Sequence, residues 1–82
     1  MTALDLIKQG WCQNDYHKVI DGKYYYCSHR AIFKAYGPNE SKIYLALCKF
    51  REVIGHYDIS DWNDDPARTH KQVIEAFEKA RV

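Results

Sequence analysis

Long apolar runs are missing from this 82-residue sequence, in which no apolar stretch exceeds a few residues. A helix that crosses a bilayer needs about 20 mostly apolar residues in a row, so we expect no membrane segment. The first ten residues also lack the basic-then-apolar layout of a secretory signal, which predicts a cytoplasmic protein.

Cysteine is sparse, and the three residues Cys12, Cys27 and Cys48 are an odd number. An odd count without an export signal argues against a disulfide framework and predicts reduced thiols. Structural zinc sites use pairs of ligands two to four residues apart, whereas here only Cys27 and His29 are close, with one residue between them. The sequence therefore predicts no metal and no cofactor.

Catalytic signatures are also lacking. Cys27 and His29 could form a nucleophile and its base, but no third orienting group and no glycine-rich oxyanion loop accompanies them. We therefore expect no enzymatic activity, and an enzyme or metal protein centred on these two residues is the alternative. Four aspartates crowd into residues 58–65 without EF-hand spacing, and helix capping accounts for them.

The composition that is present fits one globular unit. Hydrophobic residues make up 46% of the chain and charged residues 28%, which is close to the average for folded domains. A chain of 82 residues is too short for two ordinary domains. We expect residues 1–82 to form a single small globular domain.

Local signals predict a helix and then a β-hairpin in the first third of the chain. Thr2 with Asp5 forms a capping box and Gly10 is a terminator, so a helix is expected over residues 3–9. Residues 17–20 and 23–26 flank Asp21-Gly22, a dipeptide that accepts the positive φ angles of a two-residue hairpin turn. Because an isolated hairpin is marginal in water, we expect one of its faces to lie on the helices.

Two further helices are predicted in the middle of the chain. One begins at Ser28 or His29 and stops at Tyr36, before Gly37-Pro38. The next begins after Asn39 as its cap and frays near Gly55. Its apolar stripe repeats at helical spacing, with two residues widening it, and comprises Ile43, Tyr44, Leu47, Cys48, Phe50, Ile54 and Tyr57.

The chain closes with an aspartate-rich turn around Trp62 and a last helix. Asp65 before Pro66 predicts a brief helical turn, and Thr69 with a glutamine three residues later predicts a capping box. We expect the Trp62 ring on the core and Arg68 paired with Asp58 or Asp61. The predicted fold is mainly α, with about four helices around one core and a short β-hairpin between the first and second.

Positive charge concentrates in the middle of the sequence. Residues 16–51 hold seven lysines and arginines against two acidic residues, a balance of +5, whereas residues 52–82 sum to −3. Basic side chains interleaved with tyrosines suit phosphate contact with base stacking, and complementary potentials also steer protein partners. We predict that the hairpin and the second helix contact a partner through Lys18, Lys23, Tyr24, Tyr25, Arg30 and Lys34.

Several short motifs resemble a small family of unknown function found in bacteriophages and bacteria. Its members end in a Trp-Asn-Asp, Arg-Thr, Val pattern, and many carry glycine just before an alanine where this sequence has Arg30. The residues that carry the resemblance are Gly10-Trp11-Cys12, Asp21-Gly22, Cys27, Ala31, Trp62-Asn63-Asp64, Arg68-Thr69 and Val73.

The resemblance implies a biological context and no particular activity. Small phage-encoded domains without catalytic motifs commonly occupy a surface of a host protein, including defence machinery such as CRISPR effectors. The sequence therefore predicts a non-catalytic binding or inhibitory module with a host protein as its partner. The alternative is an accessory factor that binds nucleic acid through the basic, tyrosine-rich hairpin and second helix.

Overall fold

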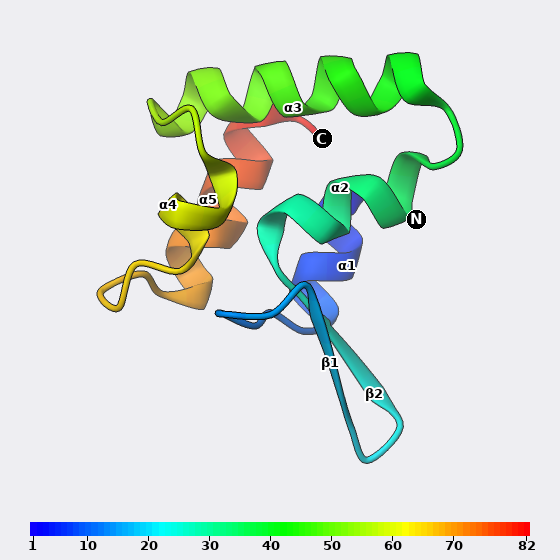
Figure 1. The fold of residues 1–82 in the computed structure, drawn as a ribbon, viewed down its shortest axis with the longest axis vertical. Coiled ribbons are helices and arrows are strands. Elements are labelled where there is room, and N and C mark those ends of the chain that lie inside the picture. The colour runs from blue at the N-terminus through cyan, green and yellow to red at the C-terminus, as the bar shows by residue number, and fades with distance from the viewer.

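Five helices and one hairpin make up the computed structural model, which describes residues 1–82 (Figure 1). The predicted class, mainly α with a hairpin between the first two helices, is confirmed. None of the helices has the length and apolar character that crossing a bilayer requires. In chain order the elements are α1 (Ala3–Gln9), β1 (His17–Ile20), β2 (Lys23–Tyr26), α2 (Ser28–Tyr36), α3 (Glu40–Ile54), α4 (Ile59–Asn63) and α5 (His70–Ala80).

The core collects apolar side chains from all five helices. Helix α3 packs on α2 and α5, and α1 packs on the same two helices (Figure 1). Phe50 of α3 is fully buried, with its ring centroid 4.3 Å from that of Phe77 and 5.5 Å from Trp62, which it meets edge to face. Such aromatic pairs stabilise a core beyond the area that they bury.

Capping residues set the ends of the helices as the sequence predicts. Thr2 with Asp5 closes a capping box at α1, and Thr69 with Gln72 closes one at α5. Gly55 ends α3 with φ 67°, in the left-handed region that glycine enters without steric cost. These local signals therefore fix where the helices begin and end.

One expectation for the apolar stripe of α3 is wrong. The rings of Tyr44 and Tyr57 were assigned to the apolar stripe of α3, yet they are 65% and 83% exposed. Tyr57 lies beyond Gly55, where the helix has already ended, and the buried stripe of α3 is narrower than its apolar pattern. The brief turn predicted at Asp65–Pro66 is present, since the Asp65 carbonyl accepts a hydrogen bond of 2.8 Å from the backbone N–H of Arg68. A further short helix, α4, precedes it, and Asp58 caps this helix by accepting a hydrogen bond from the backbone N–H of Asp61.

Trp62 packs on the core as expected, but the partner predicted for Arg68 is wrong. The Arg68 guanidinium lies 4.1 Å from the centroid of the half-buried Trp62 ring, and its Nε donates to the Trp62 carbonyl at 3.0 Å. Its ion pair is with Asp65, at 3.9 Å, and not with Asp58 or Asp61. The stack over Trp62 positions the guanidinium beside the turn that follows α4.

The hairpin has the predicted turn but not the predicted packing. Asp21 and Gly22 have φ angles of 52° and 78°, which a two-residue turn of type I′ requires. All four residues of β1 are exposed, and Tyr26 is the one buried residue of the hairpin, which projects away from the helices (Figure 1). Backbone hydrogen bonds hold the base of the hairpin instead. The Tyr26 N–H donates to the Gly10 carbonyl, and the Tyr26 carbonyl accepts from the Cys12 N–H, both at 3.1 Å.

Candidate functional site

The pairing register gives the projecting hairpin two different faces. Because side chains alternate along each strand, His17, Val19, Tyr24 and Tyr26 share one face, and Lys18, Ile20, Lys23 and Tyr25 share the other. On the first face, His17, Tyr24 and Tyr26 line a concavity of about 150 Å³ together with Arg30 and Lys34 of α2. We call these five residues the arginine face.

The opposite side of the hairpin, which we call the lysine face, consists of Lys18, Ile20, Lys23 and Tyr25. It borders a hollow of about 400 Å³ over residues 11–14. The Lys18 ammonium lies 4.0 Å from the Asp15 carboxylate, and the Lys23 ammonium lies 5.1 Å from the centre of the Tyr25 ring.

The six residues predicted to contact a partner therefore divide between the two faces. Three of them, Tyr24, Arg30 and Lys34, lie together on the arginine face. The other three, Lys18, Lys23 and Tyr25, lie on the lysine face. A single rigid surface cannot use all six at once, and their role in partner binding stays a prediction.

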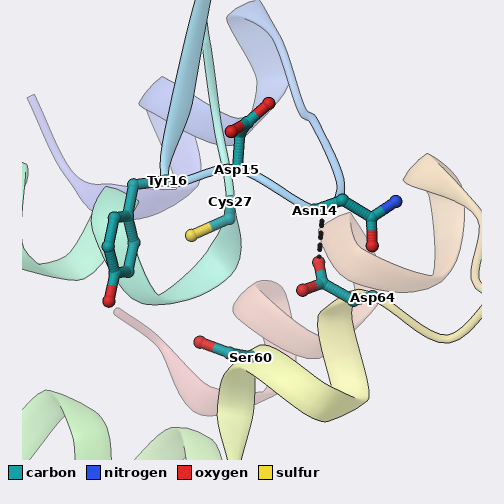
Figure 2. Close-up of a pocket in the computed structure, with 6 residues that line it drawn as sticks. All are labelled: Asn14, Asp15, Tyr16, Cys27, Ser60 and Asp64. Carbon is teal, nitrogen blue, oxygen red and sulfur yellow. Dashed lines mark hydrogen bonds between the residues drawn. The ribbon is translucent and has the colours of Figure 1, made fainter.

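A second hollow, of about 310 Å³, lies where the loop before β1 meets the start of α2 and α4 (Figure 2). Figure 2 shows the Cys27 sulfur directed toward the space between Tyr16 and Ser60. Across the hollow, one carboxylate oxygen of Asp64 accepts a hydrogen bond of 2.9 Å from the backbone N–H of Asn14. The lining residues are Asn14, Asp15, Tyr16, Cys27, Ser60 and Asp64.

Behind this hollow, the fully buried Asn63 joins three segments of the chain. Its Oδ1 accepts from Trp11 Nε1 at 2.7 Å, and from the backbone N–H and hydroxyl of Ser28 at 2.9 and 2.6 Å. Its Nδ2 donates to the Cys12 carbonyl at 3.1 Å and to the Asp64 carboxylate at 2.9 Å. A buried side chain amide satisfied by so many partners fixes the relative positions of those partners.

A family match covers the whole of the chain that contains these hollows. The model of a family of unknown function, DUF6197, matches residues 1–82. The chain belongs to this family. Among curated proteins and among solved structures, none matches it.

Cys27, which lines the hollow of this DUF6197 protein, caps α2. Its sulfur accepts from the backbone N–H of Arg30 at 3.3 Å, and burial raises the pKa of the thiol. A thiol with a raised pKa stays protonated at neutral pH and is a poor nucleophile. This environment does not favour thiol catalysis.

The ring of His29 contacts aromatic neighbours. Its ring centroid lies 4.7 Å from that of Phe33 and 6.4 Å from that of Tyr16, and the imidazole makes no hydrogen bond to Cys27. Burial, followed by the charge of Arg51, lowers the pKa of His29. The histidine therefore packs as a neutral ring between aromatic neighbours.

Three of the four crowded aspartates of residues 58–65 accept hydrogen bonds within the protein. Asp58 caps α4, Asp64 accepts from Asn14 and Asn63, and Asp65 accepts from the backbone N–H of Ala67 at 2.9 Å. No group of three or more His, Cys, Asp or Glu side chains converges in a way that could hold a metal ion. The arrangement explains these carboxylates through capping and turn formation.

Sequence reasoning missed Asn63, whose role depends on contacts with residues up to 52 positions away. No local pattern indicates this role, because Asn63 neither caps a helix nor belongs to an apolar stripe. The concavity between His17, Tyr24 and Arg30 could not be predicted from the sequence either, because it depends on the direction of α2 relative to the hairpin.

Proposed function

We propose that this DUF6197 protein is a non-catalytic binding or inhibitory module whose hairpin occupies a surface of another protein. The observation that carries the proposal is the exposure of the hairpin, because Val19, Ile20 and Tyr24 are each more than half exposed outside the helical body. Apolar and aromatic residues of this kind commonly form the centre of protein interfaces.

The chemistry of the hollow in Figure 2 also supports a module without catalysis. Cys27, its one thiol, has a raised pKa and no base hydrogen-bonded to it. The hairpin, in contrast, offers side chains that make contacts and perform no reaction. Binding is therefore the activity that the exposed groups support best.

The proposed setting is a phage or another mobile element acting on a host protein in the cytoplasm, such as a defence or CRISPR effector. The resemblance described above supports the setting, and three free cysteines suit a reducing compartment. The following experiment tests the binding surface alone, and its outcome does not depend on this setting.

The test compares three immobilised proteins in host lysate. One is the native chain, and the second replaces Val19–Tyr24 by Asn-Gly, which shortens the hairpin by two residue pairs and keeps its register. The third is a control with Tyr44→Ser and Leu45→Ser, which removes exposed apolar side chains from α3.

We expect proteins that are captured by the native chain and by the α3 control, but not by the shortened hairpin, when captured proteins are identified by mass spectrometry. Capture of nothing above background by the native chain would contradict the proposal. Equal capture by the shortened hairpin would assign binding to another surface and would equally contradict it.

A further inference from the structure

The arginine face is part of a continuous groove between the hairpin and α2. Its concavity shares His17 and Arg30 with a neighbouring one of about 240 Å³, which is also lined by Tyr16, His29 and Phe33. The groove therefore runs along α2 and has one wall from each element. An extended segment of a partner chain has the shape that such a groove accommodates.

The charge of this groove is positive and uncompensated. Arg30 and Lys34 are exposed and one helical turn apart, and neither belongs to the ion pairs of the structure, which join Lys18 to Asp15 and Arg68 to Asp65. Helix α2 has no acidic residue, and the only acidic residue of the hairpin is in its turn. Like charges one turn apart repel weakly, and an anionic ligand would relieve that repulsion.

The arrangement of the tyrosine rings favours a protein over a nucleic acid as the ligand of this groove. Tyr24 and Tyr26 stack on each other, with centroids 6.1 Å apart and planes 11° apart, and Tyr26 is buried. Lys23 covers a face of Tyr25 on the opposite side of the hairpin. Proteins that bind single strands present free aromatic faces for successive bases, whereas Tyr24 is the one exposed tyrosine of the arginine face.

We infer that the groove formed by His17, Tyr24, Tyr26, Arg30 and Lys34 binds an acidic segment of the partner protein. The inference rests on the proposed function and specifies the surface and the chemistry of the partner. Carboxylates would pair with the Arg30 guanidinium and the Lys34 ammonium, and the exposed Tyr24 ring would contact the chain between them. Arginine is suited to this role because its planar group binds carboxylates in a bidentate manner.

The experiment measures binding of fluorescent polyglutamate to the whole protein by anisotropy, at low salt and at about 0.15 M salt. A variant with Arg30→Glu and Lys34→Glu alters the arginine face. A variant with Lys18→Glu and Lys23→Glu alters the lysine face and changes the net charge by the same amount. Thermal unfolding verifies that both variants are folded.

We expect the native chain to bind polyglutamate with an affinity that falls as salt rises. The Arg30 and Lys34 variant should weaken binding by about tenfold or more, and the Lys18 and Lys23 variant by less than about threefold. An equal loss in both variants would show that net charge alone attracts the probe, and would overturn the inference.

Three other outcomes would also overturn it. Tighter binding of oligothymidylate than of polyglutamate at the same salt would assign the groove to a nucleic acid. A native dimer in sedimentation, dissociated by Arg30→Glu with Lys34→Glu, would assign it to acidic residues of a second copy. Absence of polyglutamate binding at low salt would remove the inference alone, because the lysate comparison with the shortened hairpin tests the proposed function independently.

Discussion

At the scale of single residues, Asn63 is the polar side chain on which the position of the candidate site depends. It connects the segment before the hairpin, the start of α2 and the end of α4 through five hydrogen bonds. The groups of Asn63 and Ser28 are buried, so they need protein partners. The carboxamide supplies both the acceptor and the donors that this junction requires.

Asn63→Ala should lower the free energy of unfolding by about 3 kcal/mol or more, because it leaves Trp11 Nε1 and the Ser28 N–H without an acceptor. Chemical denaturation of the variant measures this loss. Asp61→Asn is a suitable control, because Asp61 is exposed on the same short helix and should change stability by less than about 0.5 kcal/mol. Equal small effects for both substitutions would contradict the role assigned to Asn63.

At the scale of elements, two glycines position the hairpin for different reasons. A Cβ on Gly10 would lie 2.6 Å from the Tyr24 carbonyl oxygen and 2.8 Å from the Tyr25 ring, so this position requires a close approach of β2. A Cβ on Gly22 would meet nothing within 4 Å, but its φ of 78° is unfavourable for any other residue. Gly10 is thus needed at the base of the hairpin because a Cβ does not fit there, and Gly22 is needed at its tip because of the backbone conformation.

Gly10→Ala should therefore destabilise the protein more than Gly22→Ala. We expect a loss of about 1–3 kcal/mol for Gly10→Ala, from overpacking against the backbone of β2. For Gly22→Ala we expect about 1 kcal/mol or less, mainly as fraying of the exposed turn. Melting temperatures and amide exchange at Ile20 and Lys23 distinguish the two effects, and the reverse order would show that the base of the hairpin is not tightly packed.

The elements themselves were largely predictable, because their signals are local. The capping boxes at Thr2 and Thr69 and the Asp21-Gly22 turn act within a few residues, so the sequence reveals them. The exposure of β1 and of Tyr44 was not predictable in this way. An apolar pattern shows which residues can be buried, whereas actual burial depends on how the helices pack and how far each extends past its neighbours.

The candidate site was predictable in its residue types but not in its geometry. Charge and aromatic content indicated the hairpin and α2, as the grouping of Tyr24, Arg30 and Lys34 illustrates. The assignment of Lys18 and Lys23 to the opposite face follows from the strand register, which a sequence interpretation could have applied. The groove itself depends on the angle between two elements, for which the sequence has no local signal.

At the scale of the whole molecule, the hairpin is nearly independent of the core. Every residue from Val19 to Tyr24 is exposed, and the buried contacts of the hairpin end at Tyr26. Replacing Val19–Tyr24 by Asn-Gly should therefore change the free energy of unfolding by about 1 kcal/mol or less, because no buried apolar side chain is removed.

Calorimetry of the shortened protein measures this change. A matched replacement in the core, Phe50→Ala, should cost about 3–5 kcal/mol under the same conditions, because it opens a cavity among the aromatic rings of α3 and α5. Unfolding of the shortened protein near room temperature would contradict the independence of the hairpin and would show that its tip supports the fold.

The Asn63 junction also determines when a newly made chain can fold. Its partners Trp11, Cys12 and Ser28 all lie in the first third of the sequence, and Leu4 is bound in addition by the carbonyl of Val82. During synthesis, therefore, these early groups remain hydrogen-bonded to water until Asn63 has left the ribosome, because their protein partner is made later. Translation speed and chaperone access over this interval are expected to govern how much native protein a cell obtains.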